Sequence, residues 1–139
     1  MIPAPAGKLT EVGVTRKWLF VIALSIGVAM LVAMGLLFSS LTGRSMPLVA
    51  YLNPVTVLTV AIPYLCLAWT NVKRLLPWFV GLGLTLPVWG YYLYSAVYPD
   101  PGVVGANIGV GMLILASPFL IAPIVLGVDA LQRRAAGSR

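Results

Sequence analysis

The chain has 139 residues, of which 60 % are hydrophobic and only 9 % are charged. Soluble globular domains carry roughly 25 % charged residues, so this composition excludes an ordinary soluble domain. Nine lysines and arginines against three acidic residues give a net charge of +6. These cations lie at the borders of apolar stretches, so we expect them to set a membrane topology and not to bind nucleic acid.

The first 17 residues include Pro3, Pro5, Gly7 and Gly13 and show no sustained apolar period, which predicts a flexible cytoplasmic tail over residues 1–17. Basic residues in this tail precede an apolar run that continues to Leu41. The apolar core of a secretory signal peptide is only about 7 to 15 residues long, so this run favours a retained first helix.

Four apolar stretches follow in chain order, and none has a charged residue in its interior; they cover about residues 18–41, 48–70, 75–97 and 103–128. Each exceeds the roughly 20 residues that cross about 30 Å of hydrocarbon as a helix. Short connections make consecutive helices antiparallel neighbours. The sequence therefore predicts an all-α membrane protein with four transmembrane helices in an up-down-up-down bundle over residues 18–134, and a short cytoplasmic tail over 135–139.

The cations divide unequally between the two sides of this bundle. Arg44 falls on one side, and the other side carries Lys8, Arg16, Lys17, Lys73, Arg74, Arg133, Arg134 and Arg139. Positive residues in short loops stay in the cytoplasm, so we expect both termini to be cytoplasmic. The expected location is a plasma membrane of the bacterial inner-membrane type. Most Trp and Tyr residues fall near span ends, as membrane interfaces favour, and Tyr64 in mid-span is the exception.

Small residues recur on one face of the fourth span, where they form a candidate helix-packing interface of Gly102, Gly105, Gly109 and Ala116. Such a stripe lets another backbone approach closely, which is how helices associate in lipid. The partner is either another helix of this chain or a second protein chain. A lesser stripe on the first span, Ser25, Ala29 and Ala33, could supply the matching surface.

Polar residues gather on one face of the second span, and we predict a candidate polar groove from Asn53, Thr56 and Thr59, with Asn107 of the fourth span. An unpartnered Asn in hydrocarbon is costly, so this face should avoid lipid. One interpretation is the wall of a solute path. The other is interhelical hydrogen bonding, with each Thr hydroxyl also bonding back to its own helix.

Several chemistries lack the residues that they require. The chain has no histidine and a single cysteine, Cys66, which argues against haem ligation, a metal site and a disulfide. No carboxylate lies inside a span, which argues against proton-coupled transport. We expect Asp129 and Arg133 to form a solvated surface pair with no chemical role. We therefore expect neither an enzyme nor a metal protein.

These observations predict a non-catalytic accessory or structural subunit of a larger membrane complex. Its expected partners are the lipid bilayer and other membrane subunits or copies of itself, with no nucleic acid. No cofactor is predicted, although a bound lipid or lipid-soluble pigment is compatible with the spans. The alternative is a homo-oligomeric carrier or channel for a neutral or lipid-like solute, lined by the candidate polar groove.

Overall fold

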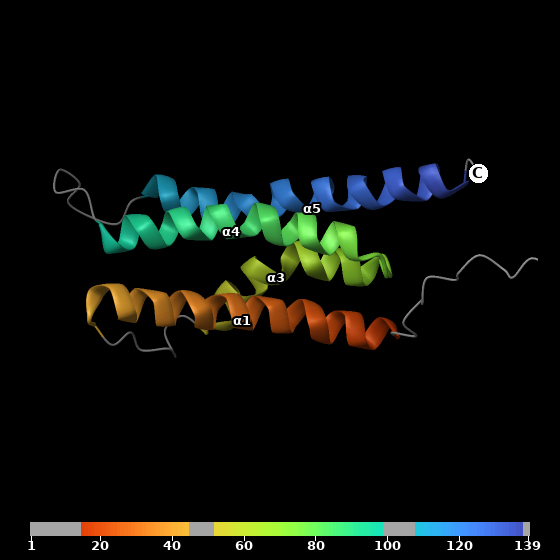
Figure 1. Cartoon of the computed structure of the whole chain (residues 1–139). Coiled ribbons are helices and arrows are strands. Elements are labelled where there is room, and N and C mark those ends of the chain that lie inside the picture. The colour runs from red at the N-terminus through yellow and green to blue at the C-terminus, as the bar shows by residue number, and fades with distance from the viewer. Residues whose placement is uncertain (1–14, 45–51, 99–107, 138–139) are drawn as a thin grey trace, which may run out of the picture.

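The computed structural model describes residues 15–44, 52–98 and 108–137. These ranges hold four helices: α1 (Arg16–Thr42), α3 (Pro54–Trp69), α4 (Leu75–Val97) and α5 (Ile108–Gly137). Successive helices run in opposite directions (Figure 1). The prediction of an all-helical chain is confirmed for the described residues, and α1 and α5 are each long and apolar enough to span a membrane.

Three of the helices differ in length from the predicted spans. α1 begins at Arg16, inside the predicted tail, and ends at Thr42. α4 has the predicted bounds, whereas α5 continues past the predicted end at residue 128 to Gly137. α3 begins at Pro54 and has only 16 residues, so it is about 24 Å long. Its start follows from local chemistry: Asn53 precedes it in extended conformation and accepts a hydrogen bond from the backbone N–H of Thr56 at 2.8 Å. Pro54 suits the first helical position, where an N–H has no partner.

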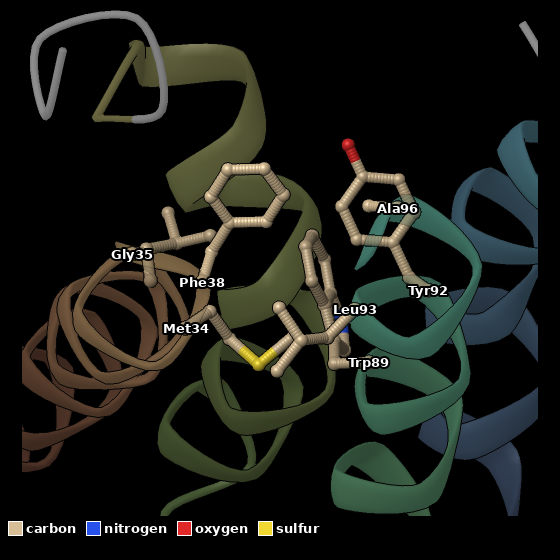
Figure 2. Close-up of a pocket in the computed structure, with 8 residues that line it drawn as sticks. Met34, Gly35, Phe38, Trp89, Tyr92, Leu93 and Ala96 are labelled. Atoms are coloured by element: carbon tan, nitrogen blue, oxygen red, sulfur yellow. The ribbon is translucent and has the colours of Figure 1, made fainter. Parts of the chain in front are cut away.

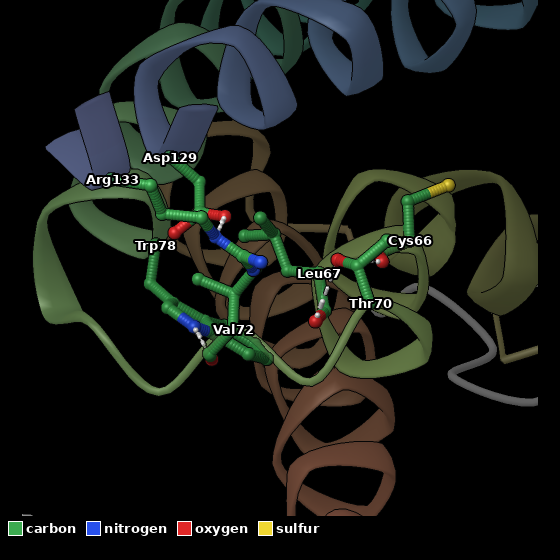
Figure 3. Close-up of polar contacts among 7 residues, drawn as sticks. All are labelled: Cys66, Leu67, Thr70, Val72, Trp78, Asp129 and Arg133. Atoms are coloured by element: carbon green, nitrogen blue, oxygen red, sulfur yellow. Dashed lines mark hydrogen bonds and ion pairs between the residues drawn. The ribbon is translucent and has the colours of Figure 1, made fainter. Parts of the chain in front are cut away.

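A tight turn joins α3 to α4. Asn71 adopts the left-handed conformation at φ 56°. The Val72 N–H donates to the Leu67 carbonyl at 2.9 Å and the Asn71 N–H donates to the Ala68 carbonyl at 3.1 Å, which is the Schellman pattern of a helix C-terminus. Buried Val72 and Leu67 lie in one apolar cluster, and the Trp78 indole donates to the Val72 carbonyl at 3.1 Å (Figure 3).

Chain order does not give the packing order of the helices. α3 packs mainly against α1 and α5, and α4 packs mainly against α5, whereas the consecutive pair α3 and α4 make few backbone contacts. In Figure 1, α3 accordingly lies between α1 and the pair formed by α4 and α5. The short α3–α4 turn makes these helices antiparallel, but it does not make them closest neighbours.

Close approach of the helices depends on two glycines. A Cβ atom on Gly27 of α1 would lie 3.1 Å from the Val57 carbonyl oxygen and 3.2 Å from the Ala61 Cβ, both in α3. A Cβ on Gly81 of α4 would lie 3.1 Å from the ring of Tyr64. The missing side chains therefore let α1 approach α3 and let a large ring fit between α3 and α4.

The core is centred on Tyr64, which is 0 % exposed. Its ring stacks on Trp78 with centroids 6.1 Å apart, and its hydroxyl donates to the Thr85 hydroxyl at 3.0 Å. Thr85 in turn donates to the Gly81 carbonyl at 2.7 Å. The position of Tyr64 away from the span ends is thus explained, because a buried partner satisfies its polar group.

Candidate interaction surfaces

A shallow, open groove runs between exposed side chains along the outer face of α1. The exposed stripe Ser25, Ala29 and Ala33 forms part of it, and the larger side chains along it are Val21, Leu24, Val28, Val32 and Leu36. The inner face of α1, with Gly27 buried, lies about 200° around the helix from Ser25. α1 therefore has small residues on two faces, one packed against α3 and one uncovered by the other described helices.

The described part of the fourth-span stripe is exposed. Gly109 and Ala116 both face outward, whereas the buried face of α5 includes Ser117, Ile121 and Val125. Gly102 and Gly105 lie outside the described residues. The described half of this candidate interface is thus available to a partner from outside the four helices.

The candidate polar groove shows local bonding in its described part. Asn53 Oδ1 accepts hydrogen bonds from both the backbone N–H and the hydroxyl of Thr56, the latter at 3.0 Å. The Thr59 hydroxyl donates to the Val55 carbonyl one turn back at 2.8 Å. Asn107 lies outside the described residues. The oxygen atoms of all three described residues are therefore used within the first turns of α3.

A crevice separates the ends of α1 and α4 farthest from the α3–α4 turn. Figure 2 shows side chains from the two helices facing one another across it, and its lining comprises Leu31, Met34, Gly35, Phe38, Trp89, Tyr92, Leu93 and Ala96. The free space is only about 10 Å³, roughly the volume that one water-sized probe needs. The crevice as it stands is therefore too narrow for an organic ligand.

Six described cations lie at one end of the bundle, which we call the basic end: Arg16, Lys17, Lys73, Arg74, Arg133 and Arg134. They come from the start of α1, the α3–α4 turn and the last turns of α5, which all lie on the right-hand side of Figure 1. The Arg16 guanidinium donates to the Trp69 carbonyl at 2.9 Å and lies 5.1 Å from the centroid of the Trp69 ring. This contact ties α1 to the last residue of α3.

The pair of Asp129 and Arg133 differs from the expected solvated pair. The Arg133 Nε donates to Asp129 Oδ2 at 2.7 Å, but the Asp129 side chain is only 7 % exposed, against 58 % for Arg133 (Figure 3). The sequence could not show this, because the burial depends on how α5 packs beside the α3–α4 turn. The carboxylate of Asp129 is therefore buried in the bundle, and the guanidinium of Arg133 contacts it from the bundle surface.

Sequence reasoning missed Gly27, Gly81 and Thr85 as contact residues. The available signal was the spacing of four between small residues on the inner face of α1, which resembles that of the outer stripe.

Among the described residues, no three His, Cys, Asp or Glu side chains lie close enough together to hold a metal ion. No protein-family model, curated protein or solved structure matches this chain.

Proposed function

We propose that the chain is a multi-pass integral membrane protein that serves as a non-catalytic subunit of a larger membrane complex. In this proposal it lies in a plasma membrane of the bacterial inner-membrane type, with the basic end in the cytoplasm. The groove on α1 receives a helix of a partner subunit, and the exposed glycine face of α5 offers a second contact.

The membrane location is supported by the exposure of the apolar helices. Only 28 % of the most apolar window of α1 and 33 % of that of α5 are buried inside the bundle. The core helix of a soluble protein would be mostly buried. Leu36, Phe119 and Leu120 are among the large side chains that remain more than half exposed. Exposed apolar surfaces of this kind are typical of contacts with lipid or with a partner helix.

The groove on α1 is the observation that carries the proposed role. Ser25, Ala29 and Ala33 follow one another at intervals of one helical turn, so a second backbone can come close along the whole row. The groove lies open along its length and its lining residues all come from α1. An open, elongated apolar groove fits a helix better than a compact solute, which is usually held in an enclosed pocket.

The location can be tested with single cysteines in a Cys66→Ala background. Thr15→Cys lies at the basic end, and Leu52→Cys lies just before α3 at the other end. In intact cells, a membrane-impermeant maleimide should label Leu52→Cys and spare Thr15→Cys until the membrane is opened. Labelling of both positions in intact cells, or loss of the protein from membranes on carbonate washing, would contradict the proposed topology.

The subunit role can be tested by filling the groove. Wild-type protein, extracted in mild detergent after cross-linking in its own membrane, should migrate as a complex larger than the single chain. Ala29→Leu should release the chain as a monomer with unchanged thermal stability, because position 29 is exposed. Gly83→Leu on α4 is the control, since position 83 is exposed and an added Cβ atom there meets no atom within 4 Å. A monomeric wild type, or equal behaviour of both variants, would refute the role.

A further inference from the structure

The basic end carries an excess of positive charge that the described chain does not neutralise. Asp129 is the only carboxylate side chain in the described ranges, and it is paired with Arg133. Arg16 is engaged by the Trp69 carbonyl. The other four cations are exposed and no acidic side chain of the described ranges is paired with them: Lys17, Lys73, Arg74 and Arg134.

Two exposed indoles lie beside these cations. Trp18 is 61 % exposed next to Lys17, and Trp69 is 69 % exposed at the end of α3, just before the turn that carries Lys73 and Arg74. Indole rings prefer the level of the lipid headgroups, where an apolar ring and a polar N–H are both accommodated. The rings thus mark the depth at which the cations would meet a bilayer surface.

The opposite end of the bundle has a different surface. Its described residues include one cation, Arg44, and its exposed aromatic side chains at the end of α4 are tyrosines, Tyr91, Tyr94 and Tyr98. Both ends can therefore lie at a membrane interface through their aromatic rings, but the basic end attracts negative charge more strongly because it carries more cations.

We infer that the basic end binds the phosphate groups of anionic phospholipids in the leaflet that surrounds it. This inference rests on the proposed membrane location. The charge is complementary, since exposed ammonium and guanidinium groups without acidic partners face a layer of phosphate oxygens. The contact between Arg16 and Trp69 holds the start of α1 beside the end of α3, so a lipid headgroup near this contact can meet cations of α1 and of the α3–α4 turn. Such a lipid would hold these elements together from outside.

The experiment uses the full chain reconstituted in vesicles of equal parts phosphatidylglycerol and phosphatidylcholine. After mild extraction, native mass spectrometry measures the ratio of anionic to zwitterionic lipid that stays bound. The wild type should retain phosphatidylglycerol preferentially, and the double variant Lys73→Gln with Arg74→Gln should lower the ratio about 25-fold, since each cation near an anionic surface contributes about a fivefold preference and the two factors multiply. Arg44→Gln, which removes one isolated cation at the other end, is the control and should lower the ratio by no more than about fivefold.

Two further arms separate folding and location from lipid binding. The charge-conserving pair Lys73→Arg with Arg74→Lys should keep the wild-type ratio, and added salt should lower it by screening. If the wild type inserts in the vesicles but retains both lipids equally, or if Arg44→Gln matches the double variant, the inference is wrong while the membrane location stands. If the chain fails to float with the vesicles at all, the proposed location fails and the inference falls with it.

Discussion

The hydroxyl of Tyr64 in α3 donates a hydrogen bond of 3.0 Å to the hydroxyl of Thr85 in α4, and both side chains are buried. The two helices make few backbone contacts, so their packing depends on side chains. Among these are Tyr64, Thr85 and Trp78, whose ring stacks on that of Tyr64. The bond has a direction, and its two partners should therefore respond unequally to mutation.

We expect Thr85→Val to destabilise the bundle more than Tyr64→Phe. Thr85→Val leaves the buried Tyr64 hydroxyl without an acceptor, at a cost of about 1 to 3 kcal/mol. Tyr64→Phe removes the donor, while Thr85 keeps its bond to the Gly81 carbonyl, so the cost is about 1 kcal/mol. Unfolding in mixed detergent, followed by tryptophan fluorescence, measures both. A double variant that costs the full sum of the two would show that the residues act independently.

Gly27→Ala should weaken the packing of α1 against α3. The added methyl would lie 3.1 Å from a backbone oxygen that cannot rotate away, so α1 has to shift, at a cost of about 1 to 3 kcal/mol. Gly83→Ala is the matched control, because its methyl meets no atom within 4 Å and alanine favours the helix by about 0.5 to 1 kcal/mol. Equal melting temperatures for the two variants would contradict the close approach at Gly27.

Asn71 should tolerate glycine and reject branched residues. Its left-handed conformation at φ 56° costs nothing for glycine, little for asparagine and about 1 to 2 kcal/mol for other residues. Asn71→Gly should therefore keep the melting temperature of the wild type, and Asn71→Val should lower it. If valine is accepted without loss, the turn does not need the left-handed residue that ends α3.

Arg16→Gln should loosen the contact between α1 and the end of α3. The substitution removes a charged hydrogen bond to the Trp69 carbonyl and the cation from the Trp69 ring, together about 1 kcal/mol. Lys17→Gln removes the same charge at a neighbouring exposed position with no such contact and should change stability by less than about 0.5 kcal/mol. Measurements in a zwitterionic detergent keep anionic lipid from contributing to either value.

Removal of Arg133 should cost more stability than removal of Asp129. Arg133→Gln leaves a carboxylate that is 7 % exposed without its partner, for which we expect about 1 to 2 kcal/mol because Arg133 itself is half exposed. Asp129→Asn leaves an arginine that water can solvate, at a cost below about 1 kcal/mol. Arg134→Gln, at the next residue, should be neutral. The opposite order of the first two variants would place the carboxylate in solvent.

The sequence by itself determined the helical class and much of the extent of each helix. Long uncharged apolar runs favour helices whatever their partners, and α4 begins and ends where its run does. The start of α3 can also be predicted from the local sequence, because Asn53 followed by Pro54 is a strong signal for a helix N-terminus. The longer apolar run around it suggested an earlier start. The division of the cations between the two ends likewise follows from their positions in the sequence.

Only the tertiary structure decided which faces of these helices meet. α1 has small residues on two faces with similar spacing, and nothing local distinguishes Gly27, which packs against α3, from Ala29, which lines the exposed groove. The burial of Asp129 and the pairing of Tyr64 with Thr85 also depend on residues far apart in the chain. In helices with so few charged positions, the hydrophobic pattern cannot separate the inner face of a helix from its outer face, so shape complementarity between helices makes that choice.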